Sequence, residues 1–169
     1  MDEPHKEHKK DAPRSVSIAI LSISSTRTLE NDKSGLLLKA LFEEAGHRVV
    51  SHTVVKDDVR KIRDAVRGHA SDRNVDSIVT TGGTGLTSDD FTTRSIRPLF
   101  ESELSGFVPI FMLLSYEDVG PACMVSQPIA GIINRKPVFC LPGSSKACEL
   151  AARRIIVPEL PHMMRHLSF

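Results

Sequence analysis

The sequence lacks a surplus of charge of either sign. Its 169 residues contain 22 Lys and Arg against 21 Asp and Glu, which gives a formal net charge of +1. A protein that binds a nucleic-acid backbone or an anionic membrane surface needs excess positive charge to pair with phosphates, so this balance argues against both partners. It favours a small-molecule partner instead.

Long hydrophobic runs are also missing from the sequence. No apolar segment approaches the roughly 20 residues that a membrane-spanning helix needs, and residues 1–6 lack the apolar stretch of a secretory signal. We therefore expect no membrane segment and a cytoplasmic location.

Cysteine and histidine patterns that would indicate disulfides or metal sites are sparse. Cys123, Cys140 and Cys148 form no Cys-x-x-Cys pair, and their odd number argues against a disulfide framework, so we interpret all three as reduced thiols in the core. Only His162 and His166 share a predicted helical face. No third metal ligand accompanies them in the sequence, so a surface helix explains them better than a metal site.

The predicted organisation is a short polar tail followed by one domain. Residues 1–14 are polar, contain two prolines and bury too little apolar surface to become ordered, so we interpret them as a disordered tail. Residues 15–169 have the size and hydrophobic content of a single domain with a substantial core. No internal repeat or low-complexity linker interrupts them.

Strand and helix patterns alternate along this domain. Short apolar runs rich in β-branched residues predict strands, and amphipathic stretches predict helices that end near Gly46 and Gly68. Such alternation implies parallel strands with helical crossovers, hence a three-layer, doubly wound α/β fold with a mostly parallel sheet and helices on both faces. The predicted strands are residues 15–23, 48–55, 75–80 and 136–141, and the predicted helices are residues 34–45, 59–67, 91–97, 107–114 (a buried helix), 146–154 and 158–166.

Four loops follow the predicted strands. In an open parallel sheet, ligands bind beyond the carboxyl ends of the strands, so we expect these loops to converge on one site. The loops are residues 24–34, 56–58, 82–90 and 142–145.

A glycine-rich turn at residues 80–85, Thr-Thr-Gly-Gly-Thr-Gly, follows the third predicted strand. Its glycines let backbone amides approach a phosphate closely, and neighbouring hydroxyl groups add donors, so the turn is a candidate anion cradle. It matches neither the Walker loop nor the Gly-x-Gly-x-x-Gly dinucleotide fingerprint. From spacing alone, a plain strand-to-helix turn explains the glycines equally well.

Aspartates beside this turn favour a site for metal and phosphate together. Asp89 and Asp90 follow the turn, and a carboxylate next to a phosphate cradle is electrostatically costly unless a cation lies between them. Mg²⁺ prefers one or two carboxylates plus phosphate oxygens, and Asp57 or Asp58 would supply the second carboxylate. The alternative for Asp57 and Asp58 is capping of the helix predicted to begin at Val59.

Two other loops carry weaker signals. Asp32 and Ser34 are typical caps of the helix that they precede, and residues 142–145, Pro-Gly-Ser-Ser, are typical of a strand-to-helix turn. The same turn residues ahead of a helix also suit a second anion site. Two anion sites with a metal between them fit a pair of substrates that carry several phosphates.

A series of short segments occurs in an order and spacing that cover nearly everything after the tail. The segments are residues 18–21 (Ile-Ala-Ile-Leu) with Ser24, 32–35 (Asp-Lys-Ser-Gly), 44–47 (Glu-Ala-Gly-His), 80–87 (Thr-Thr-Gly-Gly-Thr-Gly-Leu-Thr), 115–117 (Ser-Tyr-Glu), 130–131 (Ala-Gly), 141–144 (Leu-Pro-Gly-Ser) and 146–148 (Lys-Ala-Cys). This set resembles the molybdenum-cofactor biosynthesis proteins of the MogA/MoaB type, a family that also includes the G domain of gephyrin. The resemblance is closest to the MoaB branch.

The resemblance implies a molybdopterin-binding α/β domain that adenylylates the terminal phosphate of molybdopterin with Mg²⁺ and ATP and releases pyrophosphate. It implies that Asp57 and Asp90 are the catalytic, metal-binding aspartates, and that the protein is a homotrimer or a hexamer of two trimers. It further implies contacts to pterin or phosphate from Ser24, Asp32, Ser34, Gly35, Gly82, Gly83, Thr84, Gly85, Ser115, Ser126, Pro142, Gly143 and Ser144.

The chain departs from the family pattern at two places. Gln127 follows Ser126 where many members have arginine, and residues 24–27, Ser-Ser-Thr-Arg, replace Ser-Asp-Arg. Two functional hypotheses stay open: an adenylyltransferase, or a molybdopterin-binding or scaffold protein without a catalytic rate of its own. A generic nucleotide-binding regulator is a third hypothesis with less support.

Overall fold

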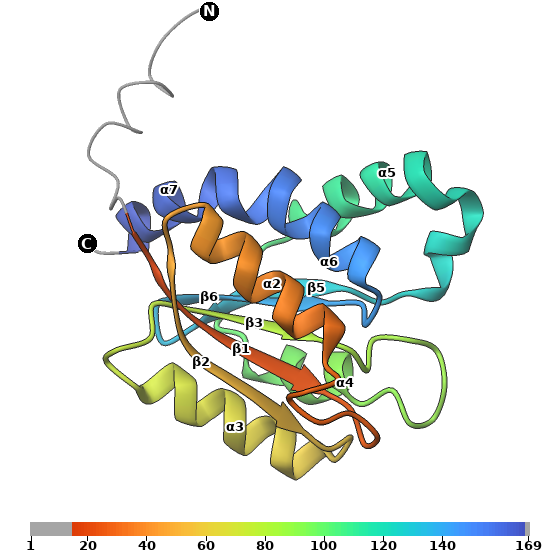
Figure 1. Ribbon diagram of the computed structural model, residues 1–169, viewed down its shortest axis with the longest axis horizontal. Helices are drawn as coiled ribbons and strands as arrows, with labels where there is room; N and C mark the ends of the chain where they lie inside the picture. Colours follow the sequence, from red (N-terminus) through yellow and green to blue (C-terminus); the bar gives the residue numbers. More distant parts are fainter. Residues whose placement is uncertain (1–14, 168–169) are drawn as a thin grey trace, which may run out of the picture.

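The computed structural model describes residues 15–167, which form a six-stranded mixed sheet with helices on both faces (Figure 1). The predicted tail at residues 1–14 lies outside the described residues, as do residues 168–169. The sheet order is β2-β1-β3-β6-β5-β4. The strands are β1 (Ser17–Ile23), β2 (Arg48–Val55), β3 (Ser77–Thr81), β4 (Ser102–Glu103), β5 (Ile129–Ile133) and β6 (Lys136–Leu141).

Four neighbouring strands are parallel, which confirms the predicted doubly wound α/β fold. β1 pairs in parallel with β2 and β3, and β3 pairs in parallel with β6. β5 and β4, which were not predicted from the sequence, extend the sheet in antiparallel pairing. A two-residue turn joins β5 to β6 with positive φ at Asn134 (48°) and Arg135 (61°). Such a hairpin turn usually carries glycine, so its sequence gave no turn signal.

The helices agree with the predicted order but differ at their ends. Gly46 has a positive φ of 86° and follows the end of α2, as predicted. Gly68 has no positive φ, and α3 continues through it to Ser71. A π-helical segment, η3 (Ala152–Ile156), joins the last two helices into one continuous stretch. The helices are α2 (Lys33–Glu44), α3 (Val59–Ser71), α4 (Thr92–Ile96), α5 (Phe107–Val119), α6 (Ser145–Ala151) and α7 (Val157–Leu167), with 3₁₀ segments η1 (Arg97–Leu99) and η2 (Gly120–Val125).

Hydrophobic side chains cover both faces of the sheet, and β1 is buried along its whole length. Ile18 and Ile20 pack on the face covered by α2, α5, α6 and α7, while Ala19 and Leu21 pack on the face covered by α3 and α4 (Figure 1). Successive strand residues point to opposite faces, so a strand between two helical layers must be apolar throughout. This explains the continuous apolar run and fixes the strand ends that carry the loops.

α5 is only partly buried, which corrects the expectation of a buried helix. Phe107 and Phe111 pack into the core, but Ile110, Leu113 and Tyr116 are each more than half exposed. Residues 107–125 are also long and apolar enough to cross a membrane by length and composition alone, contrary to the prediction, with a mean hydropathy of 1.3. Because α5 packs on β5 and α6, we interpret it as a helix of the fold with an apolar outer face.

Two of the three cysteines are buried free thiols, as predicted. Burial raises the pKa of Cys140 to about 12 and that of Cys148 to about 11, which keeps both protonated and unreactive. Cys123 is a free thiol in η2 and only half-buried, so its placement in the core was wrong.

Candidate functional site

The four predicted loops converge beyond the carboxyl ends of β1, β2, β3 and β6, which confirms their expected placement. Together they line an open cleft of about 400 Å³. The loop after β1 contributes Ser24 and Arg27, the loop after β2 contributes Asp57, and the loop after β6 contributes Gly143. The glycine turn and the residues that follow it contribute Gly82, Gly83, Thr84, Thr87, Asp89 and Asp90, and the end of β1 and its loop add Ile23 and Thr26.

The glycine turn needs its glycines for backbone geometry. Gly82 and Gly83 have φ values of 97° and 63°, and a Cβ atom would collide with the Ile23 carbonyl at Gly82 and with Thr92 Oγ1 at Gly83. Thr92 holds the turn, because its Oγ1 donates to the Gly82 carbonyl (2.6 Å) and its amide donates to the Gly83 carbonyl (2.9 Å). The structural explanation of these two glycines is therefore correct.

The same turn also leaves backbone donors available. The amides of Gly83 and Thr84 donate to no other residue that the structure describes, while the carbonyls of Gly82 and Gly83 are turned toward Thr92. Successive backbone amides in a turn with positive φ form a concave arrangement that binds anions. This geometry is compatible with an anion cradle, which stays a prediction beside the structural explanation.

Asp58 and Asp57 have different roles although they are adjacent. Asp58 is the N-cap of α3, and its Oδ1 accepts a hydrogen bond from the Lys61 amide (2.9 Å). The Asp57 carboxylate accepts no hydrogen bond from the described residues, and its Oδ1 lies against the glycine turn, 3.4 Å from where a Gly83 Cβ would be. The capping alternative therefore applies to Asp58 and leaves Asp57 facing the cleft.

Asp90 both lines the cleft and holds the glycine-rich loop. Its Oδ2 accepts hydrogen bonds from the Thr87 hydroxyl (2.7 Å) and the Thr87 amide (2.9 Å). The Thr87 hydroxyl is the main cause that lowers the pKa of Asp90, and the amides of Thr87 and Gly85 and the charge of Arg94 add to it against a smaller effect of burial. Asp90 is consequently ionised at neutral pH.

The carboxylates in the cleft fit Mg²⁺. Asp57, Asp89 and Asp90 all line it, and Asp57 brings an unpartnered carboxylate. The described residues contain no cluster of three or more His, Cys, Asp or Glu side chains that would enclose a metal by themselves. Mg²⁺ is commonly held by one or two carboxylates together with water and substrate phosphates, so this donor set suits a metal that arrives with a phosphorylated substrate.

Asp32 and Gly35 lie behind the cleft rather than in its lining, which corrects their expected contact with substrate. The Asp32 carboxylate is fully buried and accepts hydrogen bonds from the Ser22 hydroxyl, from His52 Nε2 (2.8 Å) and from the Gly35 amide (3.2 Å). Burial alone would raise the pKa of Asp32, but these hydrogen bonds outweigh it and lower the pKa. Gly35 has no room for a Cβ atom beside this group. Asp32 is the N-cap of α2, as its sequence position indicated.

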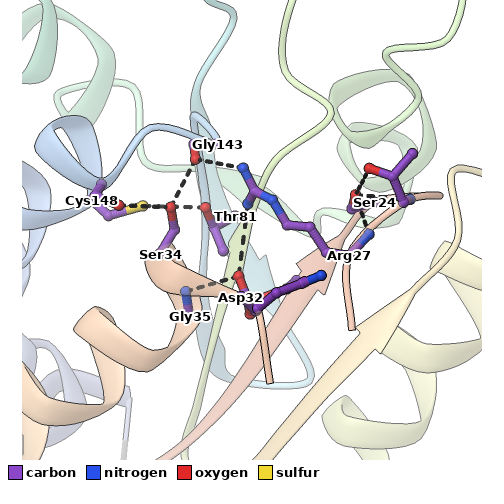
Figure 2. A network of polar contacts seen from close by, with 12 residues as sticks. Ser24, Arg27, Asp32, Ser34, Gly35, Thr81, Gly143 and Cys148 are labelled. Carbon is purple, nitrogen blue, oxygen red and sulfur yellow. Dashed lines mark hydrogen bonds and ion pairs between the residues drawn. The ribbon is translucent and has the colours of Figure 1, made fainter. Parts of the chain in front are cut away.

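Ser34 and Ser144 hold the turn at residues 142–145. Ser34 Oγ donates to the Gly143 carbonyl (2.8 Å; Figure 2). The same oxygen lies 3.2 Å from Ser145 Oγ. Ser144 caps α6 by accepting from the Ala147 amide (3.2 Å), whereas Ser34 bridges two loops and does not cap its own helix. These contacts fix the position of the Gly143 turn relative to α2.

A second, smaller hollow of about 140 Å³ adjoins the cleft. Pro142 and Ser144, the sequence neighbours of the cleft residue Gly143, line this hollow. Ser126 also lines it, and its Oγ lies 3.3 Å from Thr84 Oγ1 in the glycine turn. The predicted contacts Ser115, Ser126, Pro142 and Ser144 all lie in this hollow, together with the apolar side chains Phe111, Val119, Ala122, Ala147 and Leu150.

Arg27 lines the cleft although the sequence suggested no role for it. Its guanidinium Nη2 donates to the Gly143 carbonyl (3.3 Å), and Nη1 lies 3.7 Å from Asp32 Oδ1 (Figure 2). The available signal was its position in a loop after a buried strand, where ligands bind in this class of fold.

Comparison with known proteins places the chain in a family. The family model "Probable molybdopterin binding domain" matches residues 19–162. "Molybdenum cofactor biosynthesis protein B" of Bacillus cereus is 48% identical over 158 residues, which cover 93% of this chain and 94% of that protein. A crystal structure of molybdenum cofactor biosynthesis protein B has a TM-score of 0.90 at 46% identity and covers 93% of this chain and 98% of its own.

A more distant solved structure agrees. The tungsten cofactor synthesizing protein MoaB from Pyrococcus furiosus has a TM-score of 0.78 at 34% identity, over 94% of this chain and 100% of its own. The chain belongs to the MogA/MoaB-type family of molybdenum cofactor biosynthesis proteins.

Proposed function

We propose that the protein binds molybdopterin and adenylylates its terminal phosphate with Mg²⁺ and ATP. One observation carries this proposal: the unpartnered Asp57 carboxylate and the ionised Asp90 line the same cleft as the glycine-turn amides. A cleft with three carboxylates repels phosphates unless a cation is bound, so it suits a metal-bound triphosphate. The adjoining hollow, with Phe111 and Leu150, offers an apolar floor for a planar ring.

The proposed reaction is a direct phosphoryl displacement. An oxygen of the terminal phosphate of molybdopterin attacks the α-phosphorus of ATP, the bond from that phosphorus to the bridging oxygen breaks, and pyrophosphate leaves. The attacking phosphate is already anionic at neutral pH, so no residue of this chain has to remove a proton. Positioning by the amides of the glycine turn and charge neutralisation carry most of such a reaction.

Asp57 and Asp90 would hold the magnesium ion. When bound, Mg²⁺ neutralises charge that develops on the triphosphate oxygens. The role of this chain is to keep the two carboxylates in place: Thr87 fixes Asp90, and the capping of α3 by Asp58 fixes the backbone next to Asp57.

The decisive assay is magnesium-dependent release of pyrophosphate from ATP in the presence of molybdopterin. We expect release that needs both molybdopterin and Mg²⁺ and that stops when the metal is chelated. Pyrophosphate release without molybdopterin, or no release with all components present, would contradict the proposal.

A second function is favoured by the bonding of Asp90. Its Oδ2 is used by Thr87 to hold the loop, so a purely structural Asp90 is also consistent with the geometry. In that case the protein would bind molybdopterin as a non-catalytic binding or scaffold protein of the same pathway. Such a protein would bind molybdopterin but release no pyrophosphate in the assay above.

We further propose that the outer face of α5 is covered in a homotrimer or a hexamer. Ile110, Leu113, Tyr116 and Val119 recur at helical spacing on this face and are about half exposed or more. Leu113→Glu should reduce the mass measured by sedimentation at micromolar concentration to that of a monomer. An unchanged mass would contradict the use of this face.

The proposed substrates also bear on the partners and the location of the protein. Small phosphorylated molecules account for the charges of the cleft, so the proposal includes neither a nucleic acid nor a membrane as partner. ATP is supplied in the cytoplasm, where we place the reaction.

A further inference from the structure

We propose that Arg27 is a substrate-positioning residue that holds a phosphate monoester to which no metal is bound. This inference rests on the proposed function, in which that phosphate is the terminal phosphate of molybdopterin. The magnesium-bound triphosphate would be held by the carboxylates and the attacking phosphate by the guanidinium, so the two anions occupy separate parts of one cleft.

The position of Arg27 supports this role. Its side chain lines the cleft and is 35% exposed, so ligands have access to it. The guanidinium has five N–H donors in a fixed plane, and the Gly143 carbonyl and Asp32 engage only its two Nη atoms. Donors therefore remain for an anion, and this planar fork matches a phosphate in two-point contact.

The surroundings hold Arg27 in place before a ligand binds. Asp32, which faces its Nη1 atom, is fully buried and is itself fixed by Ser22, His52 and the start of α2. The loop that carries Arg27 is held by Ser24, whose Oγ accepts from the Arg27 amide (3.2 Å; Figure 2). A cation fixed in this way loses little conformational freedom when it binds an anion.

The charges of the cleft also favour a metal-free phosphate as the partner of Arg27. Among the described residues that line the cleft, Arg27 carries the one positive charge, against the carboxylates of Asp57, Asp89 and Asp90. A metal-bound triphosphate is attracted to carboxylates through its metal, but a metal-free phosphate is repelled by them. Arg27 is the group in this lining that pairs with such a phosphate directly.

The test is to measure the binding of inorganic phosphate to the full chain by titration calorimetry, in buffer that contains a chelator and no Mg²⁺. We expect millimolar phosphate to bind the wild type and Arg27→Gln to weaken this binding about tenfold or more, as expected for loss of charge-assisted hydrogen bonds. Arg153→Gln is the matched control, because Arg153 pairs with Glu44 and Glu149 on the surface, outside the cleft lining. It should bind phosphate like the wild type.

Arg27→Lys separates direct contact from support of the fold. Lysine keeps the charge but loses the planar fork, so its phosphate affinity should lie between those of wild type and Arg27→Gln. A purely structural role would instead lower the melting temperature of both variants, and Arg27→Lys and Arg27→Gln would then have the same phosphate affinity as each other. Wild-type affinity in Arg27→Gln, equal loss in both variants, or no binding to the wild type would each overturn the inference.

The two proposals fail in distinguishable ways when pyrophosphate release is measured on the same samples. Pyrophosphate release by the wild type together with unchanged phosphate affinity in Arg27→Gln would reject only the role of Arg27. Lost phosphate binding in that variant together with no pyrophosphate release by the wild type would reject only the adenylylation reaction. In an active enzyme, Arg27→Gln should raise KM for molybdopterin more than KM for ATP.

Discussion

Asp57 and Asp32 lie in loops that follow the neighbouring strands β2 and β1, yet their carboxylates have different surroundings. Asp57 accepts no hydrogen bond from the described residues and faces the cleft. Asp32 is fully buried, with Ser22, His52 and the Gly35 amide as hydrogen-bond donors. A carboxylate without donors is available for a cation, whereas one with its donors in place stabilises the fold, so position after a strand does not decide the role.

Asp57→Asn should have the largest effect on activity. The amide keeps the shape of the side chain but removes the negative charge proposed to hold Mg²⁺, so pyrophosphate release should fall about 100- to 1000-fold. The free energy of unfolding should stay close to that of the wild type, because no described residue donates to this carboxylate. A stable variant with full activity would remove Asp57 from the site.

Asp32→Ala should have the largest effect on stability. It leaves buried donors on Ser22 and His52 without an acceptor and removes the N-cap of α2, so unfolding in urea should need about 3 kcal/mol less. An unfolding free energy within the error of the wild type would contradict the structural role of Asp32, and with it the contrast to Asp57.

The pH dependence of stability should show a smaller effect of the same group. The pKa of Asp32 is lowered in the folded protein, so its contribution is complete above the unfolded value near 3.8 and is lost as the pH falls through the folded value. The difference in unfolding free energy between wild type and Asp32→Asn should therefore be constant near neutral pH and shrink below about pH 3.8. If this difference in unfolding free energy increased as the pH falls, the pKa of Asp32 in the folded protein would have to be raised, contrary to the prediction.

Asp58→Ala should have the smallest effect. It removes the hydrogen bond to the Lys61 amide at the start of α3, so the melting temperature should fall by about a few degrees at most. Pyrophosphate release should fall far less than in Asp57→Asn, because the Asp58 side chain caps α3 and does not line the cleft. A loss of activity as large as that expected for Asp57→Asn would mean that the two neighbouring aspartates cannot be separated by role.

The sequence was sufficient to predict the layers of the fold because local patterns carry that information. The continuous apolar run of β1 and the loops after the parallel strands predicted where the cleft lies. The antiparallel β5 escaped prediction because the turn at Asn134 and Arg135 adopts positive φ without glycine. The exposed face of α5 escaped it as well, since an apolar sequence does not reveal whether a partner or the core covers it.

The site was predicted in part for the same reason. The glycine turn and both aspartates were visible as residue types after strands, but the choice between Asp57 and Asp58 depended on which side chain reaches the Lys61 amide. The hydrogen bond from Arg27 to the Gly143 carbonyl joins two loops that are more than a hundred residues apart in the sequence. Asp32 and Gly35 are buried beneath these loops. Such contacts depend on the packed fold and leave no local pattern.

The role of Asp57 in metal binding is tested most directly by the Mg²⁺ concentration dependence of pyrophosphate release, measured in parallel for wild type, Asp57→Asn and Asp58→Asn. We expect Asp57→Asn to need a much higher Mg²⁺ concentration to reach half of its remaining activity, and Asp58→Asn to need the same concentration as the wild type. Equal magnesium requirements in all three proteins would contradict the assignment of the metal to Asp57.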